Sequence, residues 1–383
     1  MDFKYTEEQL ALQDTLRRFV ARDYGFDQRR ALAGSPLGYS AVAWRRYAEL
    51  GLLALPFPEA FGGLGGGGVD IMAVMEIVGR GLLLEPYLST VVLGGGLIRD
   101  AASDALKAAL LPGIAAGTVR LALAAYESAG RYDLAHVACR AVPDGGGWRL
   151  SGRKHVVLDA PSAEYLLVSA RSGGDVADAE GISLFLVPRD AAGLAIVAYP
   201  TQSGGRAADV DLLDVRIGGD SLIGAPGQSL GIIERAVDCG MAALCAEALG
   251  IVAALNEATL DYLKARKQFG VPIGSFQALQ HRMAEMFIAA EQLRSMAILA
   301  AVHADSRDAG ERRRAVSGAK AYIGQAARFV GQQAVQLHGA MGVVDGLIVS
   351  HYFKRLTMID MTFGDADFHL ARFSDSGVQN RCG

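Results

Sequence analysis

Two long apolar stripes in the C-terminal half of the sequence limit the fold more than any other feature. The first stripe is formed by Leu230, Ile233, Val237, Met241 and Leu244. The second is formed by Val316, Ala319, Ile323, Ala327, Val330, Ala334 and Leu337. Steps of three and four residues place apolar side chains on one face of an α-helix. If the first helix continues to Arg266, it is about 55 Å long. Such helices bury their stripes most simply in an antiparallel bundle.

The middle of the chain has a different pattern, in which short apolar runs alternate with turn-prone residues. The runs cover residues 119–125, 148–151, 165–168, 182–187 and 210–217. Short apolar runs between turns predict β-strands. Residues before 119 are helical in pattern and open with a capping box from Thr6 to Gln9. We therefore expect an α+β, mainly α protein. Its predicted parts are an N-terminal helical domain (1–118), a middle β-sandwich or barrel-like domain (119–226) and a C-terminal four-helix bundle (227–383).

The composition excludes several classes of function. A hydrophobic share of 51% with 20% charged residues indicates a soluble globular chain, and a formal net charge of -4 gives no basic field for nucleic acid. The four cysteines lack metal-ligand spacing, so we expect no metal site and a reducing cytoplasm. The polar N-terminus predicts no secretory signal. The apolar stretch 239–255 contains Glu247, which favours a buried helix over a membrane span.

Two polar blocks interrupt the helical C-terminal sequence. The first is the segment 266–270, Arg-Lys-Gln-Phe-Gly, followed by Phe276-Gln277, and the second is Gln336-Leu337-His338-Gly339. Taken alone, these are ordinary polar positions at helix ends. The same chain carries LGLLALPFPEAFGGLG, the β module, DCG and QLHGAMG in a fixed order. In that order the chain resembles the acyl-CoA dehydrogenase flavoproteins over essentially its whole length. LKARKQFGVPIGSFQALQH, HYFKRLTMID and FGDAD most resemble the small subunit of pimeloyl-CoA dehydrogenases.

The resemblance implies an FAD-dependent oxidoreductase of fatty acid metabolism that converts an acyl-CoA thioester to its 2,3-enoyl form. In that chemistry a carboxylate removes the α-proton while the β-hydrogen leaves as hydride to the flavin. Electron-transfer flavoprotein is the implied electron acceptor. The implied assembly is a homo-oligomer or a heteromer with a related dehydrogenase chain. The narrower resemblance points to a dicarboxyl-CoA such as pimeloyl-CoA as substrate.

The resemblance also assigns site residues. Arg266 matches an arginine that meets the FAD diphosphate across a subunit boundary, a role that suits a planar guanidinium. The other implied cofactor contacts are Gln268, Phe269, Phe276, Gln277, Gln336, Leu337, Gly339, Ala340, Ala125, Tyr126, Val156, Val157 and Leu158. The implied substrate contacts are Tyr132, Asp238 and Met241. Tyr126 replaces a threonine, Tyr132 replaces a serine, and Val156 replaces a tryptophan of the family. The segment 154–158 fits a plain buried strand equally well.

The carboxylate that this chemistry needs is missing from both positions where the family keeps it. Phe363 occupies the first position, and the second falls on Gly240, followed by Met241 where the family has arginine. Two carboxylates lie near these positions. Asp365 also fits a helix N-cap. Glu234 lies about 9 Å away along the helix and also fits a solvated helix residue.

Three hypotheses stay open at this point. The first is a dehydrogenase subunit that works beside a related partner chain. The second is a self-sufficient dehydrogenase that uses Asp365 or another carboxylate as its base. The third is a catalytically incomplete scaffold or acyl-CoA-binding protein that has lost its flavin.

Overall fold

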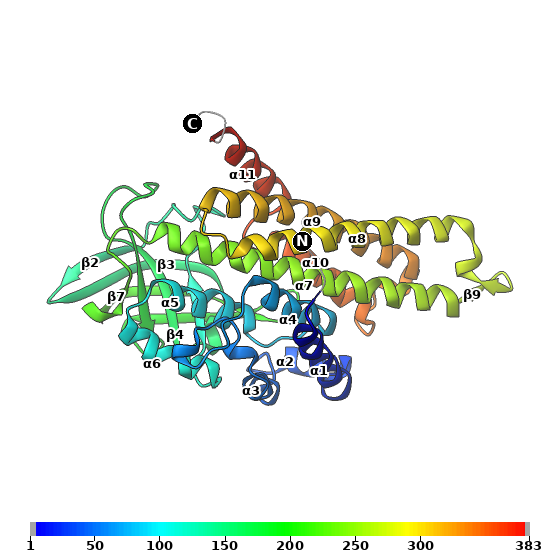
Figure 1. Ribbon diagram of the computed structural model, residues 1–383, viewed down its shortest axis with the longest axis horizontal. Coiled ribbons are helices and arrows are strands. Elements are labelled where there is room, and N and C mark those ends of the chain that lie inside the picture. Colours follow the sequence, from blue (N-terminus) through cyan, green and yellow to red (C-terminus); the bar gives the residue numbers. More distant parts are fainter. Residues whose placement is uncertain (1–4, 380–383) are drawn as a thin grey trace. The chain divides into compact units, whose positions relative to one another are not determined.

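The structure, a computed structural model, describes residues 5–379 and consists of helices, one large mixed sheet and a short hairpin (Figure 1). The N-terminal helices are α1 (Glu7–Asp23), α2 (Phe26–Gly34), α3 (Ala41–Glu49), α4 (Gly68–Gly81), α5 (Gly96–Ala101) and α6 (Asp104–Ala115), with 3₁₀ turns η1 (Leu52–Ala54) and η2 (Glu59–Phe61) and a π-helix, η3 (Leu88–Gly95). The C-terminal helices are α7 (Leu230–Ala265), α8 (Gln277–Ala304), α9 (Ala309–His338), α10 (Ile348–Met361) and α11 (Ala366–Gln379), with 3₁₀ turns η6 (Ile273–Ser275) and η7 (Gly339–Val343). The predicted order of a helical part, a β part and a second helical part is confirmed.

The middle part is one sheet of eight strands. They are β1 (Leu121–Ala124), β2 (Arg140–Asp144), β3 (Gly147–Leu158), β4 (Tyr165–Arg171), β5 (Ile182–Pro188), β6 (Leu194–Pro200), β7 (Arg206–Gly218) and β8 (Leu222–Ile223), with turns η4 (Ala160–Ser162) and η5 (Gly219–Ser221). The sheet order is β6-β7-β3-β2-β4-β5-β8, and β1 pairs in parallel with β4 in the register Leu121 to Tyr165. The pairing of β3 with β7 shifts between Lys154 and Val157, which marks a β-bulge.

The chain divides into two compact units built from non-consecutive segments. The described part of the first unit comprises residues 5–30, 68–83 and 241–379, and the second comprises residues 31–67 and 84–240. The linear boundaries at residues 118 and 226 stay a prediction. In the first unit, Thr6 and Gln9 form the predicted capping box, since the Thr6 hydroxyl accepts from Gln9 N at 3.2 Å and the Gln9 amide oxygen accepts from Thr6 N at 3.0 Å.

Both apolar stripes form helices whose stripe is buried. Leu230 is half-buried, whereas the rest of the first stripe and all of the second are at most 5% exposed. Figure 1 shows α8 and α9 side by side in the first unit, with the short hairpin of β9 (Lys267–Gln268) and β10 (Val271–Pro272) at the end of α7. In the described part of the chain, α7 is the one helix long and apolar enough to cross a membrane, but 89% of its most apolar window is buried, as in a core helix.

Helices α4 and α7 approach each other at two glycines. A Cβ on Gly250 would lie 1.8 Å from the carbonyl oxygen of Glu76, and one on Gly79 would lie 2.0 Å from that of Glu247. Each glycine therefore faces main chain of the other helix. Beside this crossing, the buried Glu247 carboxylate accepts from Arg355 Nε at 2.5 Å and Nη2 at 2.7 Å. The charge that interrupts the apolar stretch of α7 is thus paired in the core.

Candidate functional site

The first polar block forms a hairpin at the end of α7, residues 267–272, which is called the Phe269 hairpin below. Phe269 and Gly270 are its two turn residues, with φ of 53° and 81°. Positive φ at both positions is typical of the type I′ turn, which is rare for phenylalanine. The Phe269 side chain is 91% exposed, and its ring meets that of Phe276 edge-on at 6.2 Å. The hairpin therefore holds an aromatic pair outside the core, as a surface that a ligand or another chain would cover.

Arg266 stands at the base of this hairpin. Its carbonyl oxygen accepts from Ile273 N at 2.8 Å, and its own N–H donates to Tyr262 O at 2.8 Å. Within residues 5–379, no hydrogen bond or ion pair holds its exposed guanidinium. The main chain is thus fixed while the charged group keeps all of its donors, as phosphate binding requires. Arg266, Gln268 and Gln277 are exposed and fit the diphosphate end of FAD.

The second polar block lies beside the first. The ring of His338 stacks on that of Tyr262, one helical turn before Arg266, with centroids 4.4 Å apart and planes at 27°. His338 is buried, its Nδ1–H donates to Ala334 O at 2.8 Å, and burial lowers its pKa, so the ring is neutral at pH 7. Tyr262 was missed by the sequence analysis. Its spacing of four from Arg266 is the only signal for it, and the stack itself depends on tertiary structure.

The residues of the second block differ in exposure. Gln336, Gly339 and Ala340 are exposed at the end of α9, whereas Leu337 is 5% exposed and belongs to the apolar stripe. Gly339 has φ of 59°, which ends the helix at little steric cost. The exposed members can meet an adenosine, and Leu337 supports them from the core.

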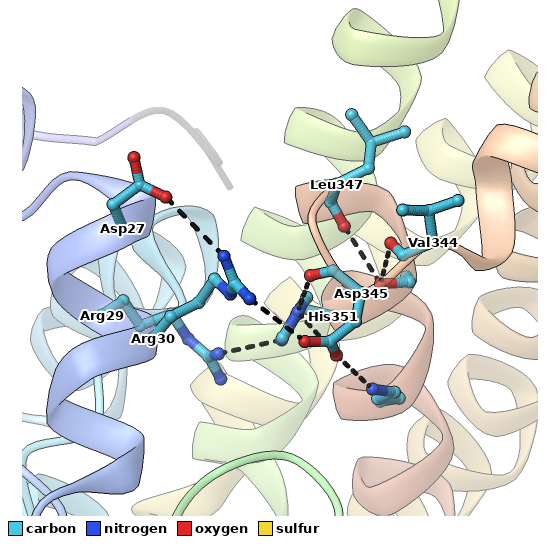
Figure 2. A network of polar contacts seen from close by, with 9 residues as sticks. Asp27, Arg29, Arg30, Val344, Asp345, Leu347 and His351 are labelled. Atoms are coloured by element: carbon cyan, nitrogen blue, oxygen red, sulfur yellow. Dashed lines mark hydrogen bonds and ion pairs between the residues drawn. The ribbon is translucent and has the colours of Figure 1, made fainter.

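A polar network holds the loop that follows this block (Figure 2). The Arg29 guanidinium donates to His351 Nδ1 at 3.1 Å and to Leu82 O at 3.0 Å. Since an arginine can only donate, Nδ1 accepts, and Nε2–H donates to Asp345 O at 2.9 Å. The Asp345 carboxylate pairs with Lys354 at 3.0 Å and Arg30 at 3.5 Å. The network requires a neutral His351, and burial lowers the pKa of that ring.

We expect this network to weaken in acid. The pKa of His351 lies below its ordinary value of 6.5 in the folded state, so the unfolded chain binds the proton more readily. Its contribution to stability is complete above pH 6.5 and is lost as the pH falls, at up to about 1.4 kcal/mol per pH unit. Urea unfolding between pH 7.5 and 5 should therefore show a smaller loss for His351→Asn than for the wild type. A loss in His351→Asn as large as that in the wild type would contradict the role of His351 in this pH dependence.

The β module contributes a second set of predicted contacts, within the other compact unit. Ala125 is buried, Tyr126 is half-buried, and Tyr126 O accepts from His155 N at 2.9 Å. Beneath them the buried Lys154 ammonium donates to Glu127 Oε1 at 2.7 Å and to Ser169 Oγ at 3.0 Å. Burial alone would raise the pKa of Glu127, but Lys154 and two main-chain N–H groups outweigh it and hold that pKa below its usual value. The segment thus rests on a buried ion pair.

The segment Val156–Leu158 has features of both predicted roles, a plain buried strand and a surface that contacts the flavin. Val157 is 1% exposed and lies in the core of the sheet, whereas Val156 is 57% exposed at the β-bulge with φ of 51°. A β-branched residue rarely adopts positive φ, so the bulge is strained and turns Val156 outward. Val156 and Leu158 can face a ligand. Tyr132 is half-buried, and Asp238 and Met241 are each 1% exposed within α7.

The first position that the resemblance assigns to the base lies in a tightly held turn. Phe363 has φ of 63°, and its carbonyl oxygen lies 3.2 Å from His369 Nε2. The buried Lys320 ammonium donates to Asp360 O and Gly364 O, both at 2.8 Å, and burial lowers its pKa to about 8. The main chain on both sides of Phe363 is therefore fixed, but the side chain there cannot accept a proton.

The two neighbouring carboxylates lie at the start of α11 and within α7. Asp365 Oδ1 accepts from Phe368 N at 2.9 Å, so Asp365 caps α11 as the helix-cap interpretation expected. Glu234 is half-buried on α7, and the helix from Glu234 to Gly240 is unbroken, which keeps the predicted register. Catalytic roles for Asp365 and Glu234 stay predictions. The described residues contain no group of three or more metal-ligating side chains.

Comparison with known proteins covers almost the whole chain. Models of the acyl-CoA dehydrogenase N-terminal, middle and C-terminal domains match residues 6–118, 122–215 and 230–376. The probable acyl-CoA dehydrogenase YngJ of Bacillus subtilis is 27% identical over 96% of this chain and 97% of its own length. A structure described as a variant of the Tcur3481-Tcur3483 steroid ACAD is 33% identical, with a TM-score of 0.88 over 98% of this chain and 99% of that one. The ChsE4-ChsE5 complex of Mycobacterium tuberculosis is 25% identical, with a TM-score of 0.88 over 99% of each chain. The chain therefore belongs to the acyl-CoA dehydrogenase family, whose members are FAD-dependent oxidoreductases that act on CH–CH bonds.

Proposed function

We propose that this chain is the base-deficient subunit of a heteromeric acyl-CoA dehydrogenase, in which a related chain supplies the carboxylate. One observation carries the proposal: Phe363 occupies the base position on a turn whose main chain is fixed by Lys320. A fixed turn argues that this part of the site retains its shape. The chemistry at that position has changed, because phenylalanine offers an apolar wall instead of a proton acceptor.

Two further observations support a heteromer. The Phe269 hairpin keeps an exposed aromatic pair and an unpaired guanidinium ready for another surface, as far as residues 5–379 show. The similar solved structures include one described by two joined names and one described as a complex of two named chains. By analogy, the partner of this chain is a related dehydrogenase that retains its glutamate.

The residues of this chain then have distinct tasks. Arg266 binds the FAD diphosphate, and the pair of Phe269 and Phe276 covers the cofactor from the hairpin. Tyr262 and His338 hold the two polar blocks against each other. The bound FAD supplies the acceptor for the hydride. Phe363 keeps water from the reacting carbons, which strengthens electrostatic interactions in the site. Electron-transfer flavoprotein as acceptor and a cytoplasmic location belong to the same proposal.

The substrate is an acyl-CoA thioester, and two acyl classes are worth testing. The motifs around residues 262–281 favour a dicarboxyl-CoA such as pimeloyl-CoA. The steroid named for one similar structure favours a CoA thioester with a bulky ring system. Bleaching of the flavin absorbance by each thioester distinguishes them, because the flavin is reduced only when the protein dehydrogenates the thioester.

The test is to produce the chain alone and together with a dehydrogenase-like partner chain. We expect the chain alone to show no bleaching with any saturated acyl-CoA, and the co-produced complex to bleach and to contain both chains. Bleaching by the chain alone would instead support the self-sufficient enzyme. In that case Asp365→Asn should abolish the reaction. A colourless complex with no flavin would support the scaffold hypothesis.

Arg266→Ala should weaken FAD binding by about ten- to a hundredfold, because charge-assisted hydrogen bonds to phosphate are lost. The measurement is FAD titration of the apo-complex. Lys264→Ala, an exposed charge two residues earlier, removes the same unit of charge at the end of α7 and is the control. Equal FAD affinity in the two variants would reject the role of Arg266.

A further inference from the structure

The second compact unit contains a π-helix that the reaction described above does not use. This element, η3, runs over Leu88–Gly95, and residues 89–95 are all buried. π-Helices are rare, occur mostly as single-turn bulges and are frequent at functional sites. Two neighbouring residues in it, Ser89 and Thr90, bury their hydroxyl groups at 1% and 0% exposure. A buried hydroxyl needs a partner, and each of these reaches a different part of the sheet.

Ser89 reaches the end of the Val156–Leu158 segment. Its hydroxyl lies 2.6 Å from Asp159 Oδ2 and 3.2 Å from Pro86 O, so the carboxylate is the closer acceptor. Asp159 directly follows Leu158 and has φ of 56°. A non-glycine residue in this conformation persists only when its surroundings fix it. The bond from Ser89 is one of the contacts that fix it, together with the bond from Asp159 N to Arg206 O at 3.0 Å.

Thr90 reaches the strand that leads to Ala125 and Tyr126. Its hydroxyl donates to Leu121 O and accepts from Leu121 N, both at 3.3 Å. One side chain thus bonds both main-chain groups of Leu121, the first residue of β1. A Cβ on Gly94 would lie 2.5 Å from Leu121 Cβ, so the π-helix contacts this strand closely enough to require glycine. The position of β1 therefore depends on η3.

We propose that Ser89 and Thr90 are positioning residues for the flavin, because together they fix the two strand ends, Ala125–Tyr126 and Val156–Leu158, in relation to each other. This inference rests on the proposed assignment of those two segments to the flavin. Adjacent residues on one rigid, buried element link the two segments, so a shift of one is transmitted to the other. The π-helix places both hydroxyls where they reach these separate partners. Removing either hydroxyl should loosen both segments without removing any direct cofactor contact.

The test uses four variants of the full chain in complex with its partner. Ser89→Ala and Thr90→Val remove the hydroxyls at nearly constant volume, and Thr90→Ser keeps the hydroxyl while removing the methyl group. Ser162→Ala is the control, because its hydroxyl bonds the main-chain oxygen of the same Asp159 at 3.0 Å and leaves the carboxylate alone. FAD affinity, the flavin midpoint potential and hydrogen exchange of residues 121–128 and 156–161 are measured for each.

We expect Ser89→Ala and Thr90→Val to weaken FAD binding by about three- to tenfold, to shift the midpoint potential and to speed exchange in both segments. Thr90→Ser and Ser162→Ala should resemble the wild type. Faster exchange with unchanged FAD affinity and potential would overturn the positioning role and leave a purely structural one. Unchanged exchange would overturn the coupling itself. A wild-type complex without FAD would count against the flavin assignment, and hydrogen exchange would still decide the coupling.

Discussion

The Phe363→Glu variant should gain flavin reduction by acyl-CoA, which the proposed base-deficient wild-type chain is expected to lack. The new carboxylate would lie on a turn that is already fixed by Lys320 and His369, at the position that the resemblance assigns to the base. Correctly placed general base catalysis contributes about 10²- to 10⁴-fold in rate. We therefore expect the rate of bleaching to rise by about that factor, measured by stopped-flow absorbance on this chain with FAD and the acyl-CoA that the complex accepts.

The matched control is Phe363→Gln. It has the same shape as the glutamate variant and similar polarity, but it has no basic oxygen at neutral pH. Bleaching in the glutamate variant should also rise with pH as the carboxyl ionises. Equal rates for the two variants, in protein that still binds FAD, would show that the rest of the site has lost its catalytic geometry. The proposal of a retained but base-deficient site would then fail.

Gly250→Ala should destabilise the first compact unit by about 3 kcal/mol, at the upper end of typical overpacking costs. The added Cβ would lie 1.8 Å from Glu76 O, and real contacts of this kind do not fall below 3.0 Å. The obstacle is helix main chain, which has no alternative rotamer. Gly79 makes the reciprocal contact with Glu247 O at 2.0 Å, so the helices cannot slide past each other to relieve it. Alanine is better than glycine in a helix by only about 1 kcal/mol, which does not offset this cost.

Gly231→Ala is the control in the same helix. Nothing lies within 4 Å of its added Cβ, so we expect no loss and a gain of up to about 1 kcal/mol. Urea unfolding followed by circular dichroism gives both values, provided that the slope with urea stays constant. Similar midpoints for the two variants would mean that α4 and α7 can separate at little cost, contrary to the crossing described above.

The sequence was sufficient for the parts of the fold that depend on local periodicity. Both apolar stripes, the end of the long helix near Arg266 and five strand regions were predicted, because burial of one face leaves a regular pattern. Strands β2, β6 and β8 of the large sheet, and β9 and β10 of the hairpin, were missed. β2 contains Arg140, Pro143 and Asp144, so it has no apolar run, and β8, β9 and β10 have only two residues each. β6 is an apolar run that was not recognised, and all of it is exposed or half-exposed at the edge of the sheet.

The sequence named candidate site residues where they depend on residue identity and did not name those that depend on tertiary contacts. The blocks at Arg266 and Gln336, and the phenylalanine at the predicted base position (Phe363), were identifiable from the sequence, and their roles stay predictions. The stack of Tyr262 on His338, the clamp from Lys320 and the π-helix around Ser89 were not. Each of these joins residues far apart in the chain or uses a backbone form without a sequence signature. The narrower resemblance to a pimeloyl-CoA dehydrogenase subunit likewise stays a prediction.

The Phe269 hairpin has a consequence for how the cell must produce this chain. A phenylalanine that is 91% exposed at the tip of a two-residue turn is a site for non-specific hydrophobic association whenever nothing covers it. If the proposed partner chain covers this surface, surplus copies would associate with one another or be degraded, and their lifetime would depend on the supply of that partner. Matched synthesis of both chains, for example by translation from one messenger RNA, is the arrangement that such a surface favours.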